Sequence, residues 1–430
     1  MNNCSSSSSP SLHPDVTLTL TIPSSSSKAS PLEPEQRGIY LIQHLITCAK
    51  HTASGNLHHA DSCLRQISHL ASISGDSLQR LAARFASALA LRLVKHWPGV
   101  YKALSYTQRP NNPELDLARR VFRKAFPYLG FAYSIIARTL LQSMSHEGVI
   151  HIVDLGSGDT KLWVPLIRSF ALLPSGIIPH LRISCVHGDK AVLDKLGQRL
   201  VKEAQALDMT FQYNPINVAN LKELDIVMFE QRSGEALAFV SVLNLHALLA
   251  EDDRVDAHFF RGKSKDAGIV VKECKQMEKF LTTIRSMCPK VVLLVEQEAD
   301  HNLNRLVDRL VGSLNYYSAV FDSLDVTFGS SSSLMEERLA LEEMFGREIE
   351  NIIACEGLER VERHERYGRW LVRFGGAGFK PVRLWFNGLE DCKKMVEAYG
   401  KDGYKIVSNK ASLVICWHER PLYAVSAWTC

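Results

Sequence analysis

The six residues Asp154-Leu-Gly-Ser-Gly-Asp159 combine an acidic side chain with two closely spaced glycines, directly after a short apolar segment. Glycines in such a place let the backbone turn tightly beside a ligand, and the start of the next helix offers free N–H groups. Enzymes that use S-adenosylmethionine commonly carry an acidic-x-Gly-x-Gly-x-Gly turn at this point. Asp154, Gly156 and Gly158 are therefore candidates for holding a small molecule, and methyl transfer is the chemistry that such a site would serve.

The same region also departs from the cofactor pattern. Thr160 stands where the third glycine of the motif would be. The second apolar segment should end in a carboxylate that binds ribose hydroxyls, but His187 is there, and Asp189 follows two residues later. A single glycine motif identifies a site poorly. A purely structural turn and a cofactor loop are both consistent with this sequence.

The spacing of cysteines and histidines predicts no metal site. The ten cysteines occur singly, without a Cys-x-x-Cys pair, and no Cys/His cluster has zinc-finger spacing. None of the sixteen histidines falls in a metal-ligand pattern, and we interpret His151 as a core residue or one that supports a site. Buried, reduced thiols explain the cysteines. We therefore expect no catalytic set of residues, no metal and no cofactor.

A leucine motif in the middle of the chain is a candidate for partner binding. The segment Leu245-His-Ala-Leu-Leu249 matches Leu-x-x-Leu-Leu. On a helix this spacing places Leu245, Leu248 and Leu249 on one face, which can dock in the groove of a partner protein. The alternative is a helix that simply packs on the sheet, because a buried helix has leucines at the same spacing.

Arginines alternate with glutamates in the segment that begins at Glu359. Arg360, Arg363 and Arg366 are candidates for a partner or DNA surface, because guanidinium groups bind phosphates and carboxylates through paired hydrogen bonds. The interleaved glutamates equally fit ion pairs along a solvated helix face. The sequence leaves both interpretations open.

Composition narrows the classes of protein to which the chain can belong. Its 430 residues, 46% of them hydrophobic, suffice for a large core or two coupled subdomains. A formal net charge of +4 permits DNA contact without indicating it. The start has neither a basic nor an apolar signal region, and the longest apolar stretch, 236–250, is too short and polar to span a bilayer. We expect a soluble intracellular protein that does not contact membranes.

The chain divides into three parts by composition and periodicity. Residues 1–34 are rich in serine and proline and cannot bury enough apolar surface to offset their ordering entropy, so we expect disorder there. From 35 to 146, apolar residues recur at three- and four-residue steps, which predicts a cap of paired helices. Residues 147–430 should form the core, with a charged helical insertion near 300–375.

Short apolar segments separated by helical stretches predict the sheet of this core. Buried strands that alternate with helices give a parallel sheet with right-handed crossovers. Two apolar segments around 418–421 predict an antiparallel hairpin, with Trp428 as a core anchor. The expected fold class is α/β: a Rossmann-like, methyltransferase-like, doubly wound and mostly parallel sheet with a terminal antiparallel hairpin and an α-helical cap. The predicted strands are 149–155, 181–186, 211–216, 236–243, 291–295, 413–417 and 422–428.

Several segments, in order along the chain, resemble the GRAS family of plant regulators. One is similar to the family's Val-His-Ile-Ile-Asp signature, with conservative changes at its first and fourth positions; its residues are Ile150, His151, Ile152, Val153 and Asp154. The helical stretches on either side resemble the leucine-rich regions of the family, the first within the cap and the second including 245–249. The other matches are Pro289 with 291–297, 316–324, Arg347-Glu348, Arg360-Val-Glu-Arg363, and the terminal motif Ser426, Ala427 and Trp428.

The resemblance covers about residue 36 to the end and carries expectations about function. It implies a nuclear transcriptional regulator or co-regulator that is not an enzyme. It also implies contacts with transcription factors or other GRAS proteins, in homo- or heterodimers, and it leaves direct DNA binding open. Segments 37–49 and 420–428 look most like the scarecrow-like type three subgroup, which implies roles in gibberellin signalling and root patterning. The alternative is an S-adenosylmethionine-dependent methyltransferase or a relative that binds a small molecule.

Overall fold

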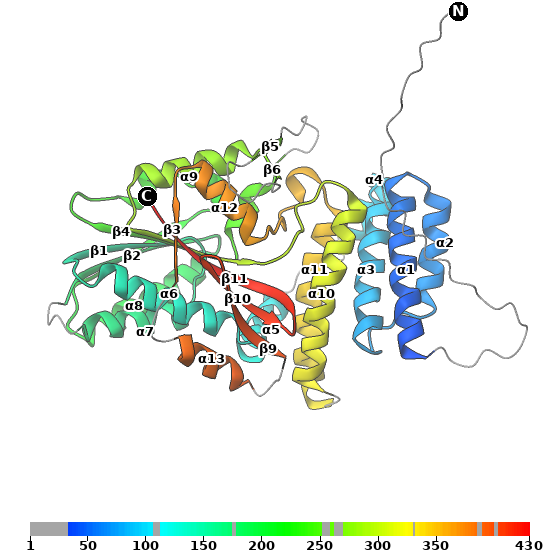
Figure 1. The fold of residues 1–430 in the computed structure, drawn as a ribbon, viewed down its shortest axis with the longest axis horizontal. Coiled ribbons are helices and arrows are strands. Elements are labelled where there is room, and N and C mark those ends of the chain that lie inside the picture. Colours follow the sequence, from blue (N-terminus) through cyan, green and yellow to red (C-terminus); the bar gives the residue numbers. More distant parts are fainter. Residues whose placement is uncertain are drawn as a thin grey trace, which may run out of the picture.

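A computed structural model describes residues 33–105, 112–173, 178–251, 259–261, 270–329, 332–384, 389–399 and 403–430. Figure 1 shows a twisted sheet with helices on both faces, and a bundle of long helices beside it. The segment expected to be disordered, 1–34, lies outside the described residues except for its last two, so that expectation stays a prediction. None of the described helices is both long and apolar enough to cross a membrane.

The sheet carries the order β3-β2-β1-β4-β7-β11-β10-β9, and β8 pairs with β11. From β3 to β7 the neighbouring strands are parallel, whereas β11 runs antiparallel to β7 and to β10. This confirms the predicted fold class, including its terminal hairpin. The strands are β1 (Val149–Asp154), β2 (His180–His187), β3 (Phe211–Asn217), β4 (Ala236–Val242), β7 (Val291–Gln297), β8 (Lys380–Val382), β9 (Tyr404–Asn409), β10 (Ser412–Trp417) and β11 (Arg420–Thr429), with a separate pair β5 (Phe259–Arg261) and β6 (Val270–Lys272).

The apolar strands lie in the centre of the sheet because helices cover both of its faces. Side chains of β1 alternate between two apolar clusters: Ile150 and Ile152 pack with α6, α7 and α8, whereas Val153 packs with α9 and α12. Figure 1 shows these two helical layers on opposite sides of the sheet. The layers are α6 (Tyr128–Met144), α7 (Thr160–Ala171), α8 (Lys190–Gln205) and α13 (Leu389–Glu397), and opposite them α9 (Lys275–Ser286) and α12 (Tyr367–Gly376).

Trp428 anchors the terminal hairpin, as predicted. Its side chain is fully buried in the cluster beneath α12 and stacks on Phe374, with the ring centroids 4.5 Å apart. The edge strand β9 was not predicted, because its second half is exposed and ends in Ser408 and Asn409, so that it lacks a long apolar run. An edge strand needs to bury little, and its sequence signal is correspondingly weak.

The helical bundle joins two segments that are far apart in the sequence. Arg80 on α3 bonds Glu342 on α11 (Nε–Oε1 2.7 Å) and also pairs with Asp325 on α10, so the first helices and the later insertion pack as one bundle. The bundle buries Leu45 of α1 and Ile67 of α2, whereas Ile39 and Ile42 of α1 are 54% and 37% exposed. The bundle helices are α1 (Pro34–Ala53), α2 (Leu57–Ser68), α3 (Ser77–Val94), α4 (Pro98–Ser105), α10 (Leu306–Phe328) and α11 (Met335–Ala354).

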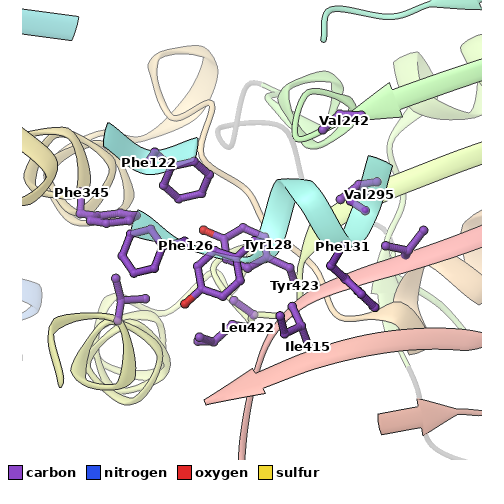
Figure 2. Packing of buried hydrophobic residues seen from close by; sticks show 14 of the residues in the cluster. Phe122, Phe126, Tyr128, Phe131, Val242, Val295, Phe345, Ile415, Leu422 and Tyr423 are labelled. Atoms are coloured by element: carbon purple, nitrogen blue, oxygen red, sulfur yellow. The ribbon is translucent and has the colours of Figure 1, made fainter. Parts of the chain in front are cut away.

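Aromatic side chains connect the bundle to the sheet. Helix α5 (Asn112–Ala125) leads into them, and Figure 2 shows Phe122, Phe126 and Tyr128 gathered beside Phe345 of α11 and Tyr423 of β11. The Tyr128 and Tyr423 ring centroids are 4.4 Å apart, and the Phe126 and Phe345 centroids are 6.2 Å apart. Such pairs stabilise a junction beyond the area that they bury.

Candidate functional site

A cavity of 270 Å³ opens beside the carboxyl ends of β1, β4 and β7. The chain crosses from β1 to β2 on one side and reaches β4 on the other, so the strand order reverses at this point. Open α/β sheets bind their ligands at such a crevice. Two very different walls face each other across it: the glycine turn after β1, and a group of histidines and carboxylates from later segments.

The carboxylate of Asp154 is committed to holding the glycine turn. It is fully buried and accepts hydrogen bonds from the backbone N–H of Ser157 (2.8 Å), the backbone N–H of Gly158 (3.3 Å) and the indole N–H of Trp163 (2.7 Å). Burial raises the pKa of Asp154 above its ordinary value, although these donors oppose the shift. The arrangement favours the structural interpretation of the turn.

Protein groups also occupy the space that the two glycines leave. The amide of Asn244 donates to the carbonyl of Leu155 (2.8 Å). A side chain at position 156, where φ is +113°, would have its Cβ only 2.3 Å from the Asn244 Nδ2 atom. At Gly158, with φ +54°, the nearest atoms would belong to Val192 and His187. The glycines are thus required by close approach of this chain's own residues.

Asp159, the last residue of the turn, is bound by side chains from α5 and α6. The Tyr133 hydroxyl donates to it (3.0 Å), and the Arg123 guanidinium lies 3.2 Å from the same oxygen. Its other oxygen accepts the backbone N–H of Lys161 and caps α7. On the second strand, the His187 ring accepts the backbone N–H of Asp189 (2.9 Å), so this end of the sheet is also closed by local bonds.

The opposite wall holds a buried imidazole between two carboxylates. His246, in the 3-10 helix η3 (Leu245–Leu249), places Nδ1 2.7 Å from Glu296 Oε2 and Nε2 3.2 Å from Glu362 Oε2. The backbone N–H of His246 donates to the other Glu296 oxygen (3.1 Å). Burial opposes the charge, but the two carboxylates raise the pKa of His246 well above its ordinary value.

Two further histidines extend this wall into the core. His364 places Nε2 3.1 Å from Glu362 Oε2, and its Nδ1 lies 2.9 Å from Nδ1 of His301. Both rings are fully buried, and burial lowers the pKa of each below its ordinary value. The Nε2 atoms of both rings lack a hydrogen bond, an exception among buried polar groups.

Glu348 completes this wall at the side of the bundle. Its carboxylate accepts hydrogen bonds from Tyr317 (2.8 Å) and Gln297 (3.1 Å). Burial, together with the nearby charge of Glu362, raises the pKa of Glu348 to about 7. Leu243 at the end of β4 adopts φ +53°, a strained conformation for a bulky residue that is typical of functional sites.

The leucine motif does not form a docking surface. Leu245, Leu248 and Leu249 are at most 3% exposed and pack in the cluster beneath α9 and α12. The alternative, packing on the sheet, is correct, and the segment forms a 3-10 helix instead of an α-helix. The spacing of the leucines therefore reflects their burial in the core.

The arginine segment is likewise buried, so the prediction of a partner or DNA surface is wrong for two of its three arginines. Residues 360–366 follow the 3-10 helix η5 (Gly357–Glu359) and have no regular secondary structure. Arg360 and Arg363 are fully buried and donate to backbone carbonyls of His301 (3.1 Å) and Gly357 (2.8 Å). Only Arg366 of the three is exposed, and it pairs with Asp300.

The signature motif in β1 is also a core element. His151 is buried and lies 2.8 Å from the Ser184 hydroxyl and 3.0 Å from the Arg182 guanidinium. Burial and the Arg182 charge lower the pKa of His151 to about 4. The terminal motif behaves similarly, because the Trp428 indole N–H donates to the Ser426 hydroxyl (3.1 Å) and Ala427 is buried.

Sequence reasoning missed the histidine–carboxylate wall. Its members come from η3, β7, the loop after β7, α11 and residues 360–366, so no single short spacing connects them all; only Glu362 and His364 are close in the sequence. One signal was available: Glu296 and Gln297 end an otherwise apolar strand. A carboxylate at the end of a buried parallel strand lies where ligands bind in this fold.

A model of the GRAS domain family matches residues 41–429 of this chain. The chain belongs to the GRAS family. Scarecrow-like protein 3 of Arabidopsis thaliana is 39% identical, over all of this chain and 98% of that protein. DELLA protein RGL1 of the same species is 33% identical, over 92% of this chain and 71% of that protein.

A solved structure agrees with this assignment. The crystal structure of SCL7 from Oryza sativa superposes with a TM-score of 0.75 at 28% identity, covering 90% of this chain and 99% of that one. Membership in the GRAS family supports the expected general role, which is regulation of transcription in plants.

Proposed function

We propose that this GRAS protein is a nuclear transcriptional co-regulator that acts by binding other proteins and carries out no catalysis. The similarity to Scarecrow-like protein 3 over the whole chain supports a place in gibberellin signalling and root patterning. The absence of catalysis in this proposal rests on the structure of the turn after β1. Asp154 and Asn244 fill with internal hydrogen bonds the place where a methyltransferase would hold its cofactor.

A groove on the bundle is the surface that we assign to the partner. It measures 650 Å³ and runs between α5 and α11, with Arg84 of α3 at one end. Met335 and Leu339 of α11 both lie in it and are 40% and 38% exposed, so the groove brings two large apolar side chains together at the surface. Charges of both signs rim it, and Arg84 pairs with Glu343 (2.6 Å).

The occupant that fits this groove is an amphipathic helix of a transcription factor or of another GRAS protein. Its apolar face would cover Met335, Leu339 and Met344, and its polar flanks would meet the mixed charges of the rim. Methionines adapt to differently shaped partners, which suits a co-regulator. Homo- or heterodimers would use the same surface. DNA is the weaker ligand here, because Arg360 and Arg363 are buried.

Capture from plant nuclei tests this proposal. Leu339→Glu places a charge in the groove, and Val311→Glu places one on α10, where Val311 is similarly exposed (44%). We expect wild type and Val311→Glu to capture transcription factors or GRAS proteins and to change a reporter's transcription, and Leu339→Glu to lose both. Equal capture by all three proteins would contradict the assigned groove. A wild-type chain that is excluded from nuclei would contradict the proposed role itself.

A further inference from the structure

Three side chains of the histidine wall converge on one point beside the cavity. Glu362 and His364 come from the irregular segment 360–366, and His246 comes from η3. One ligand atom from each lies within 4.8 Å of the other two. We propose that His246 Nε2, His364 Nε2 and Glu362 Oε2 bind a divalent transition metal, with Zn²⁺ as the ion that suits this set of ligands best.

Two of the three distances between the ligand atoms match the edges of a zinc coordination polyhedron, and the third is at most 4.8 Å. Zinc binds imidazole nitrogen and carboxylate oxygen at about 2.0–2.2 Å, so neighbouring ligands of a tetrahedral ion lie about 3.3 Å apart. Glu362 Oε2 is 3.2 Å from His246 Nε2 and 3.1 Å from His364 Nε2. Two histidines and one carboxylate form a known zinc set that leaves a fourth position open.

The ring of His364 has a buried nitrogen beside this cluster that no hydrogen bond satisfies. Its Nε2 atom is buried and has no hydrogen bond, even though a carboxylate oxygen lies only 3.1 Å away. Two atoms that are close but misaligned for a hydrogen bond are expected when both point at a third atom between them. A metal ion would satisfy the nitrogen lone pair and the carboxylate together.

Neighbouring groups hold the ligands as the supporting residues of zinc sites do. A metal-bound histidine usually donates its other ring N–H to a carboxylate or another acceptor, which fixes the ring. His246 Nδ1 meets Glu296 Oε2 at 2.7 Å, and His364 Nδ1 meets the Nδ1 atom of His301 at 2.9 Å. Both supporting residues are themselves buried, at 2% and 0% exposure.

The open coordination position faces the cavity, because all three ligands also line it. Arg119 and Arg123 of α5 lie on the same cavity, so a water molecule or an anionic group could bind the metal there. The main alternative occupant of the cluster is a proton, which would make His246 a cation between Glu296 and Glu362. The partner groove is lined by other residues except for Met344, and the metal ligands do not line it.

Zinc titration of the full chain tests the proposal. The protein is freed of metal with a chelator, dialysed, and titrated with Zn²⁺ by calorimetry, and metal content is measured on the untreated protein. The ligand variants are His364→Ala and Glu362→Gln. A third variant, Glu296→Gln, changes the residue that holds the ring of the ligand His246. His151→Ala is the matched control, because His151 is also a buried histidine near a carboxylate (3.4 Å from Glu235).

We expect about one zinc per chain in wild type and in His151→Ala, and loss of binding in His364→Ala and Glu362→Gln. Glu296→Gln should weaken binding about 10–100-fold. Circular dichroism establishes that each variant is folded, and Glu362→Gln decides the result if His364→Ala unfolds. Absence of zinc binding in wild type, or equal binding by the ligand variants and the control, would overturn the proposal.

Discussion

The two walls of the cavity use their polar groups in opposite ways. On the wall after β1, Asp154 and Asn244 form their hydrogen bonds with groups of the turn and of the helix that follows it. On the opposite wall, His301 and His364 keep buried ring nitrogens without hydrogen bonds. The first wall has the compact motif that draws attention in a sequence, whereas the second has the unused bonding capacity. In this cavity the sequence motif stabilises the turn, whereas the buried groups without hydrogen bonds indicate where a ligand can bind.

Asp154→Ala gives the largest effect expected from this comparison. Removing the carboxylate leaves the Ser157 and Gly158 backbone N–H groups and the Trp163 indole N–H without acceptors, so we expect a loss of at least about 3 kcal/mol in the free energy of unfolding. Asp189→Ala is the control, because the exposed Asp189 only caps α8 and should cost about 1 kcal/mol. Urea unfolding measures both, and equal losses would mean that the turn is not held by Asp154.

Glu298, the residue after β7, accepts the backbone N–H of Tyr367 and should make the stability of the fold depend on pH. Burial raises the pKa of Glu298 to about 7, with Tyr367 and Arg366 opposing the shift and Asp300 adding to it. The folded pKa exceeds the unfolded one, so the native state binds more protons and stability falls as pH rises from about 4.5 to about 7.

Glu298→Gln should remove that slope, because glutamine stays neutral and can still accept the backbone N–H of Tyr367. We expect the variant to gain about 2–3 kcal/mol over wild type between pH 5 and pH 8. Thermal unfolding at several pH values measures the gain. If the stabilities of the two proteins changed with pH in parallel, Glu298 would be ionised in the native state throughout this pH range.

Gly156→Ala sharpens the account of the glycine turn. A φ of +113° disfavours any side chain, and the new Cβ would meet the Asn244 amide, so we expect about 2 kcal/mol of destabilisation. Gly99 in α4 has open space and ordinary φ, so Gly99→Ala should be neutral or stabilise by up to about 1 kcal/mol. Chemical denaturation of both variants is the measurement. An undisturbed Gly156→Ala would show that the turn is loose enough to admit a ligand.

Arg366→Ala should have the smallest effect. Arg366 is about half exposed and its ion pair with Asp300 (2.7 Å) is open to solvent, so stability should change by less than about 1 kcal/mol. Melting curves at low and high salt measure this, with the buried Arg363 as the contrasting position in the same segment. A large loss for Arg366→Ala would place this exposed arginine within the structural support of the histidine wall.

The sequence predicted the elements of the fold much better than the site. Buried parallel strands have continuous apolar runs, so β1 and β7 were recognisable, and Trp428 was correctly placed in the core. Arg360 and Arg363 were misplaced because a buried arginine differs from an exposed one only in its partners. Those partners include backbone carbonyls, together with Glu356 for Arg360 and Asn302 for Arg363. Tertiary contacts also create the histidine wall, which joins residues from 246 to 364.

Calorimetric titration of the wild-type chain with S-adenosylmethionine tests the contrast between the walls most directly. Because Asp154, Asn244 and Asp159 are already committed to the protein's own groups, we predict no saturable heat at any cofactor concentration used. A one-to-one isotherm that Gly156→Ala abolishes would contradict the account. That result would show that the turn after β1 binds the cofactor. It would favour methyltransferase activity for this GRAS protein.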